Sequence, residues 1–236
     1  MCGRYTLTSS DERRLGSRFQ VSLDETGDEG LGRYNVAPTQ EVLTVQGVEG
    51  RDPATADGRG AVLARWGLVP FRAKDLKVGY RMINARSEGL LKSRAYAPLV
   101  KKPENRCLIL ADGFYEWMKA ENPKSPKQPV RFTVDGGEPF AFAGLATTRE
   151  WEGEDRTSCT ICTTEANAVV ARVHDRMPAI LPDAEAEAAW MSGELGPEEA
   201  VSLCRPIDPS RMSAKPASKS INKVGGAKEG PEMLEA

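Results

Sequence analysis

The sequence has no apolar run that approaches the roughly 20 residues of a membrane-spanning helix. Its first residues, MCGRYTLTSS, lack the basic and apolar regions of a secretory signal peptide. No internal repeat is visible, and the composition is that of an ordinary globular protein. These absences predict a cytoplasmic protein that has no membrane partner.

Cysteine is too scattered to form a disulfide framework. The chain has five cysteines, an odd number: Cys2, Cys107, Cys159, Cys162 and Cys204. The spacing of Cys159 and Cys162 is that of half a zinc site, but a structural zinc ion needs four ligands, and the chain has no second pair and only one histidine. In a strand, residues i and i+3 also point to opposite faces. We therefore predict free thiols in a reducing compartment, with no metal and no cofactor.

The small net charge conceals a basic block. Residues 65–106 contain eleven Lys and Arg against three Asp and Glu, a local charge of 11 − 3 = +8. The formal net charge is -2, so the rest of the chain carries -10. Such a block is typical of a surface that follows phosphates, although a solvated basic surface without a ligand gives the same pattern.

Strands joined by short turns dominate the pattern of the chain. We expect strands at 41–46, 61–66, 107–111 and 158–163, a hairpin of 130–134 and 140–145 around Asp135-Gly136-Gly137, helices at 10–19, 87–100, 165–172, 183–191 and 197–204, and loops at 27–32 and 50–60. Ser9 and Glu12 have the spacing of a capping box for the first helix. Signals for parallel βαβ units are few, which predicts an α+β fold with a mostly antiparallel β core and peripheral helices.

We expect one domain over residues 1–205. Residues 206–236 are rich in Ser, Lys, Pro and Gly. This composition predicts a C-terminal segment that is extended or partly disordered and packs on the domain in part.

Cys2 directly follows Met1, and methionine is routinely removed when the next residue is small. The mature chain would then begin with an α-amine and a thiol on one residue. An internal cysteine cannot offer this pair of nucleophiles.

Three other residues are candidates for chemistry. Glu116 lies between Tyr115 and Trp117, where desolvation would favour the protonated carboxyl and make it a general acid or base; an outward-facing strand residue is the alternative. His174, in a polar stretch ending at a proline, is a site residue or a surface residue. Asn84 could orient a substrate while Arg86 binds a phosphate, or could simply end a strand.

Six motifs together resemble the SOS response-associated peptidase family, the abasic-site processing proteins that crosslink covalently to damaged DNA. They are MCGRY at 1–5, GRYNVAP at 32–38, WGLVP at 66–70, INAR at 83–86, ADGFYEW at 111–117 and HDRMP at 174–178. In order and spacing they span most of the chain. The resemblance implies a single domain with barrel-like sheets.

The resemblance also implies the site residues. Its catalytic set would be Cys2 as the N-terminal nucleophile, with Asn84, Glu116 and His174. The residues that would contact DNA are Arg4, Asn35, Pro38, Trp66, Phe71, Arg72, Lys74, Arg86, Thr163 and Arg176. Arg4, Arg86 and Arg176 fall where the family binds phosphates, and Trp66 and Pro38 fall in motifs that line its DNA channel.

Two positions depart from the family pattern. Many relatives have a tryptophan where this chain has Arg72, so Phe71 or the guanidinium plane of Arg72 would have to stack on a base instead. Near the C-terminus, residues 215–218 replace a His-Pro pair that relatives often carry. The four catalytic candidates are unaffected.

By resemblance, the protein would bind single-stranded DNA and crosslink Cys2 to the aldehyde of a ring-opened abasic site as a thiazolidine, after Met1 is removed either by the protein itself or by a methionine aminopeptidase. This would protect the lesion in the DNA damage response, with a monomeric protein at the nucleoid and replication-fork proteins as further partners. Two alternatives remain at this point. One is a hydrolase in which His174 activates Cys2, and the other is a non-enzymatic reader of modified bases.

Overall fold

A computed structural model describes residues 2–24, 26, 30–48, 51–52, 58–119, 125–225 and 229–236. Met1 and parts of the expected loops at 27–32 and 50–60 lie outside the described residues. The strands are β1 (Tyr5–Leu7), β2 (Arg33–Val36), β3 (Glu41–Gly47), β4 (Arg59–Trp66), β5 (Asn84–Arg86), β6 (Arg106–Ala111), β7 (Gly113–Trp117), β8 (Pro129–Val134), β9 (Phe140–Trp151), β10 (Glu154–Glu165), β11 (Arg176–Pro178), β12 (Ile180–Leu181) and β13 (Met212–Pro216). The α-helices are α1 (Glu12–Phe19), α2 (Ala97–Val100), α3 (Ala184–Met191) and α4 (Pro197–Ser202), and the 3-10 helices include η2 (Leu76–Arg81), η3 (Ser87–Lys92), η5 (Val170–Arg172), η7 (Lys219–Asn222) and η8 (Pro231–Leu234).

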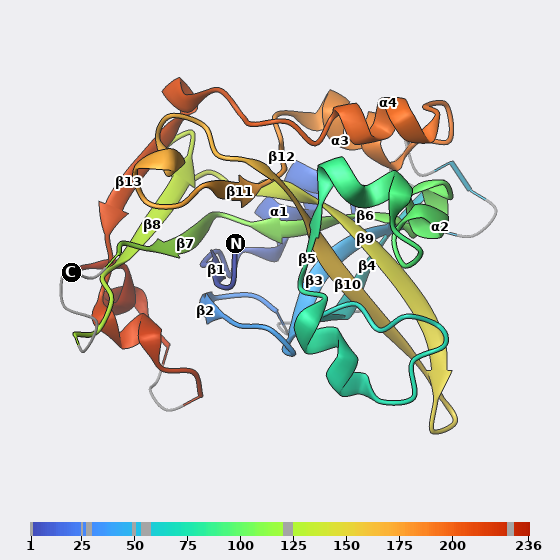
Figure 1. Cartoon of the computed structure of the whole chain (residues 1–236), viewed down its shortest axis with the longest axis horizontal. Coiled ribbons are helices and arrows are strands. Elements are labelled where there is room, and N and C mark those ends of the chain that lie inside the picture. Colours follow the sequence, from blue (N-terminus) through green and yellow to red (C-terminus); the bar gives the residue numbers. More distant parts are fainter. Residues whose placement is uncertain are drawn as a thin grey trace.

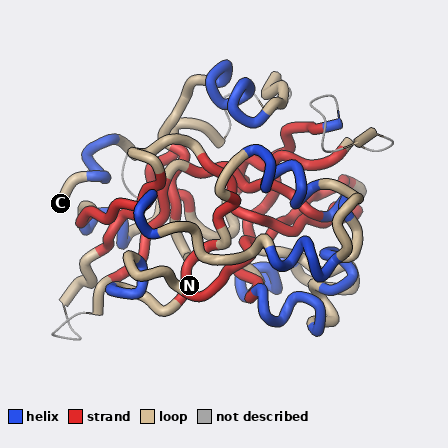
Figure 2. Tube along the Cα trace, turned by 90° about the horizontal axis from the view of Figure 1, so that it is seen from above, coloured by secondary structure: helices blue, strands red, loops and turns tan. Residues whose placement is uncertain are grey.

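The strands form two sheets. One has the order β13-β8-β7-β1-β2, and the other has the order β11-β10-β4-β3-β6-β9-β12, with β5 added alongside β10. Among the described strands, only the pairings of β10 with β4 and with β5 are parallel. The predicted α+β fold with a mostly antiparallel core is confirmed. The strands occupy the middle of the molecule, and the helices lie around them (Figure 2).

The core forms on both faces of the larger sheet. Every residue of β6 is buried, as its continuous apolar run requires, and β6 lies between β3 and β9. On β10, Cys159 packs in one apolar cluster and Cys162 in another. The two sulfur atoms therefore belong to opposite faces of the strand, as the period of two predicts.

Helix α1 is present, but its cap differs from the prediction. Asp11, not Ser9, is the N-cap residue, and its carboxylate accepts a hydrogen bond from the Arg14 N–H at 3.0 Å. The helices expected at 183–191 and 197–204 are present as α3 and α4. The helix expected over 87–100 is divided into η3 and α2 because Ser93 is extended and its hydroxyl accepts from the N–H groups of the next turn.

Two predicted elements are wrong. β8 and β9 do not pair, since β8 lies between β7 and β13 in one sheet and β9 belongs to the other sheet. At the turn after Asp135 the chain instead leaves the smaller sheet and enters the larger one. There β9 forms a hairpin with the long strand β10. The helix expected at 165–172 shrinks to η5 because Asn167 Oδ1 accepts from the N–H groups of Val169 and Val170 and begins the helical turn there.

The C-terminal segment adds to the smaller sheet. β13 pairs antiparallel with β8 from Met212 opposite Val134 to Pro216 opposite Val130. After β13, η7 follows beside β7 and β8, and Figure 1 shows this red segment on the same side of the molecule as the N-terminus. Within the described residues, no helix is long and apolar enough to cross a membrane.

Candidate active site

Cys2 lies just ahead of β1, inside the molecule. β1 pairs with both β2 and β7, which holds the residues before it between two strands. The Cys2 side chain is fully buried, and its thiol donates to the Arg4 carbonyl oxygen at a sulfur–oxygen distance of 3.5 Å. Burial, and then the nearby charge of Glu116, raise the pKa of the thiol. The sulfur is therefore held as a thiol close to the carboxyl group of Glu116.

Asn84 is joined directly to residue 2. It is the first residue of β5, which pairs in parallel with β10 so that Asn84 faces Ile161. Its amide nitrogen donates to the Cys2 carbonyl oxygen at 2.7 Å. Its Oδ1 atom is buried and has no hydrogen-bond partner within the described part of the chain. An acceptor in this position is available to a donor on the substrate or on residue 2.

Glu116 comes to the site from β7. It lies opposite Val130 of β8, and only 3% of the residue is exposed. Burial raises the pKa of its carboxyl group, and the charge of a protonated His174 lowers it in turn. The carboxyl can therefore hold a proton at higher pH than an exposed glutamate.

His174 lies between η5 and β11, on the exposed side of Glu116. Its Nδ1 accepts a hydrogen bond from the Arg176 N–H at 3.0 Å. In the neutral ring this places the proton on Nε2. The Asp175 carboxylate lies 2.9 Å from the same Nδ1.

A cavity of about 540 Å³ opens beside these groups. Its lining residues are Arg4, Glu116, Trp117, Pro126, Lys127, His174 and Asn222. A second hollow of about 950 Å³ is lined by Met118 and Lys119 after β7 and by residues between Glu165 and Asp175, among them His174. His174 therefore lines both open spaces.

Arg4 and Asn35 are held inside the protein. Arg4 Nη1 donates to Asn35 Oδ1 at 3.0 Å and to the Ile221 carbonyl at 2.6 Å, and burial lowers the pKa of the guanidinium. Asn35 is 3% exposed, and its amide nitrogen donates to the Lys223 carbonyl at 2.9 Å. Of the two, only Arg4 reaches the cavity.

Trp66 is not available to stack on a base. Its side chain is fully buried, and its indole N–H donates to the Ile83 carbonyl at 2.9 Å. No part of the ring is exposed to a base in this structure. Thr163 is also fully buried.

Arg176 is bound by the protein itself. Its guanidinium makes two hydrogen bonds to the Glu88 carboxylate, one of them at 3.1 Å, and donates to the Thr163 carbonyl at 2.7 Å. Only 12% of its side chain is exposed, compared with 58% for Glu88. A phosphate could reach Arg176 only by displacing this carboxylate.

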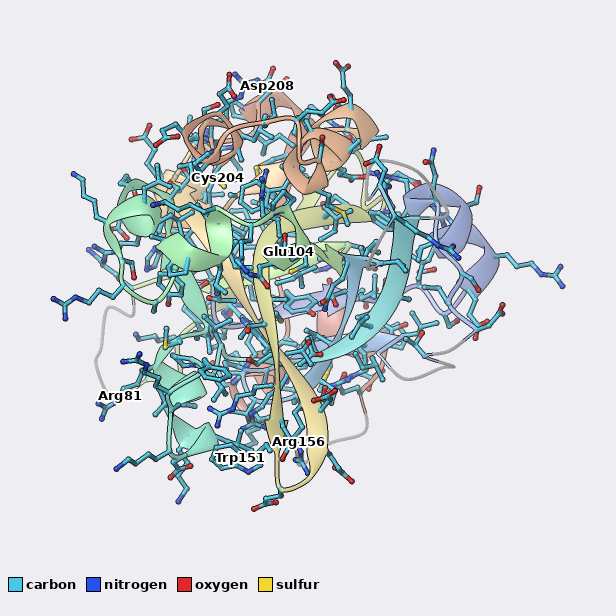
Figure 3. All side chains as sticks on the ribbon, turned by 90° about the vertical axis from the view of Figure 1, so that its right-hand side faces the viewer. Arg81, Glu104, Trp151, Arg156, Cys204 and Asp208 are labelled. Atoms are coloured by element: carbon cyan, nitrogen blue, oxygen red, sulfur yellow. The ribbon has the colours of Figure 1, made fainter. Side chains whose placement is uncertain are left out.

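Other residues expected to contact DNA are on the surface. Phe71 is 79% exposed, and Arg72, Lys74 and Arg86 are exposed as well, whereas Pro38 is half-buried. In the same region, Arg81 at the end of η2 projects away from the ribbon (Figure 3).

Part of the basic block serves the fold. Arg106 is buried and donates to the Trp190 carbonyl at 3.0 Å, and Arg65 donates to the Thr39 carbonyl at 2.7 Å. Their charges are therefore not part of a phosphate-binding surface. Other cations of the block are exposed, among them Arg72, Lys74 and Arg86.

Four residues that line the cavity were not predicted from the sequence: Trp117, Pro126, Lys127 and Asn222. Trp117 directly follows Glu116 in the sequence, and this position could have indicated that it lies at the site. Asn222 lies 105 positions after Trp117 in a polar segment, so no local pattern indicated that it reaches the cavity.

The sequence model described as SOS response associated peptidase (SRAP) matches residues 1–224. The chain is 39% identical to "Abasic site processing protein YoqW" of Bacillus subtilis (strain 168) over 245 residues, covering 100% of each. It is 30% identical to "Abasic site processing protein HMCES" of Xenopus tropicalis, covering 94% of this chain and 75% of that protein. A crystal structure of a Bacteroides thetaiotaomicron protein is similar with a TM-score of 0.81 at 20% identity, covering 100% of both chains, and it supports the fold alone.

Proposed function

The chain belongs to the SOS response-associated peptidase family, and from this membership we propose that it captures abasic sites in single-stranded DNA as a covalent adduct of Cys2. The observation that carries the proposal is the meeting of three strands at residue 2. Asn84 of β5 binds the Cys2 carbonyl, and the charge of Glu116 on β7 acts on the Cys2 thiol ahead of β1. Relatives named abasic site processing proteins align with this chain over most or all of its length.

Capture requires a free α-amine on Cys2, so Met1 is removed first. An α-amine has a pKa of about 7.7 to 8.0, and its neutral form is well populated at physiological pH, unlike that of lysine at about 10.4. The amine attacks the abasic aldehyde and forms a carbinolamine, which loses one water to give an imine. The thiol then adds to the carbon of this imine in its protonated form and loses its own proton. The product is a five-membered thiazolidine, and the net reaction releases one water.

Glu116 supplies and accepts the protons of this sequence. Because burial raises its pKa, the carboxyl can be protonated when the aldehyde binds. It donates this proton to the departing hydroxyl of the carbinolamine, and the resulting carboxylate then accepts the thiol proton. General acid–base catalysis of this kind contributes about 10²- to 10⁴-fold to a rate.

Asn84 and His174 orient the reactants. Asn84 fixes the backbone of residue 2, and its free Oδ1 can accept from the new α-amine. His174 lines the cavity with Glu116, and because its Nδ1 accepts from the Arg176 N–H, its Nε2–H is the group that can donate to the sugar oxygen or a neighbouring phosphate. Intramolecular closure of the ring by a thiol on the same residue gains from its high effective concentration.

DNA would lie along the exposed cations near this site. Arg72, Lys74 and Arg86 are exposed and can follow phosphates, and the exposed ring of Phe71 can stack on a base. We expect a monomer to bind one strand, with affinity that falls as salt rises. Protection of the lesion during the damage response and self-removal of Met1 are part of this proposal.

A thiolate hydrolase fits the site less well. Cysteine nucleophiles that cleave amides have a lowered pKa, usually beside a histidine cation. Here burial, and then the charge of Glu116, raise the pKa of the Cys2 thiol. A reader of modified bases has no use for a carboxyl buried beside a thiol.

The test is a denaturing gel of the Met1-processed protein with a single-stranded oligonucleotide that carries one abasic site, without reductant. We expect a shifted band that survives heating and is absent with Cys2→Ala. Processed protein with an acetylated α-amine should also give no band. If the wild-type band is missing, or if it persists after the amine is blocked, capture by the α-amine of Cys2 is wrong.

A further inference from the structure

The C-terminal segment forms one wall of the candidate site. Asn222, the last residue of η7, lines the same cavity as Glu116 and His174. η7 is held in place by its buried residue, because Ile221 is fully buried in a small apolar cluster with Tyr115 and Met233. The position of Asn222 is therefore set by the packing of the segment.

The amide of Asn222 joins two other parts of this wall. Its Oδ1 accepts a hydrogen bond from the Trp117 indole N–H at 2.7 Å. Its Nδ2 donates to the Lys127 carbonyl at 3.1 Å, in the segment that leads into β8. One bond uses the oxygen of the amide and the other its nitrogen. Together they fix the edge of the Trp117 indole and the backbone at Lys127.

The same segment holds Arg4. The Ile221 carbonyl accepts from Arg4 Nη1, and the guanidinium carbon lies 5.8 Å from the centroid of the Trp117 ring. A cation near an aromatic ring is held in place by both the ring and its hydrogen bonds. Residues 221 and 222 thus set the positions of a cation and an aromatic ring next to Glu116.

We propose that Asn222 is a positioning residue for DNA binding, which holds Trp117 and Arg4 so that they contact the nucleotide next to the abasic sugar. The proposal rests on the function proposed above. Asn222 is directed at the indole and the Lys127 backbone, and it takes no part in proton transfer. Its loss should therefore weaken binding of the strand and leave the rate of the covalent step in the bound complex unchanged.

The first measurement is the Kd for an oligonucleotide with a tetrahydrofuran in place of the abasic sugar, which cannot open to an aldehyde. We expect Asn222→Ala to raise this Kd about fivefold, the effect of losing one ordinary hydrogen bond. With the aldehydic oligonucleotide at saturation, the first-order rate of adduct formation should equal that of wild type. Ser220→Ala is the matched control, because the Ser220 hydroxyl bonds within its own segment, to Ser218.

A double-mutant cycle identifies the route of the effect. Trp117→Phe keeps a ring but removes the indole N–H, so Asn222→Ala should have a smaller effect in that background. In protein labelled with 5-fluorotryptophan, the fluorine resonance assigned to residue 117 should move in Asn222→Ala, while those of the other tryptophans stay in place. A role in stability alone would leave the Kd unchanged at temperatures where the variant is folded.

The proposal is overturned by an unchanged Kd in folded Asn222→Ala, or by effects of Asn222→Ala and Trp117→Phe that simply add. It is also overturned if the rate at saturation falls while the Kd holds. The non-covalent Kd does not depend on adduct formation. Failure of wild type to crosslink would therefore reject the proposed function without deciding the role of Asn222.

Discussion

The amide nitrogen of Asn84 lies 2.7 Å from the carbonyl oxygen of Cys2, although 82 positions separate the two residues. This bond ties the start of the chain to β5, which is itself fixed by its parallel pairing with β10. The backbone of the proposed nucleophile is therefore oriented by the larger sheet. Its thiol faces a carboxyl from the smaller sheet.

Asn84→Ala should slow capture without weakening DNA binding. The variant loses the bond to residue 2, and the amine becomes less well oriented. We expect adduct formation at saturating DNA to slow about fivefold to tenfold, the effect of one hydrogen bond. Quenched time courses on denaturing gels measure the rate, and the Kd for the tetrahydrofuran oligonucleotide is the control. If the affinity for the tetrahydrofuran oligonucleotide fell as much as the rate of adduct formation, Asn84 would be assigned to DNA binding instead.

Glu116→Gln should remove the general acid and base while keeping the shape of the side chain. We expect the rate of adduct formation to fall at least about 100-fold, with the Kd nearly unchanged. In wild type the rate should also decline on the alkaline side, where the carboxyl loses its proton, and this decline should be missing in the variant. A pH series of single-turnover rates tests both points.

The same substitution should stabilise the protein at high pH. A buried carboxyl with a raised pKa favours folding while it is protonated, below its unfolded pKa, and loses this contribution as the pH rises through the folded pKa. Glu116→Gln should therefore raise the Tm near pH 8 more than near pH 4, where about half of an exposed glutamate is already protonated. A Tm difference that is constant with pH would contradict the inferred protonation of Glu116.

Glu88→Gln should strengthen DNA binding. The Glu88 carboxylate occupies two hydrogen bonds of Arg176 and adds a negative charge two residues from the exposed Arg86. Removing it should lower the Kd about threefold at low salt, with a smaller difference as salt screens the charge. Fluorescence anisotropy over a salt series measures this. Weaker binding by the variant would mean that the ion pair holds Arg176 in the conformation that DNA requires.

Phe71 and Trp66 should respond in opposite ways to substitution. Phe71→Ala removes an exposed ring and should raise the Kd for single-stranded DNA, because base stacking contributes about 1 to 3 kcal/mol. Its Tm should match that of wild type. Trp66→Ala should instead cost about 3 to 5 kcal/mol of stability, since it opens a cavity in the core. A stability loss in Phe71→Ala would show that its ring packs on the protein.

Local sequence patterns correctly predicted those helices and strands whose pattern of apolar residues is sufficient to define them. The apolar run of β6, the alternating faces of β10 and the apolar stripe of α1 follow from burial periods along the sequence. The chain order of the family motifs indicated Cys2, Asn84, Glu116 and His174 together. These residues come from four separate segments. The structure brings the first three together at residue 2, and Glu116 and His174 line one cavity.

Only the tertiary structure decided which side chains are buried and which residues they bind. The sequence predicted a hairpin of β8 and β9, but strand partners depend on long-range packing, and the chain crosses to the other sheet after Asp135. The sequence also could not show that Trp66 is buried, that Glu88 binds Arg176, or that Asn222 meets Trp117 from 105 positions away. Residue type and period are local properties of a chain, whereas exposure and hydrogen-bond partners are settled by segments that meet only when the protein folds.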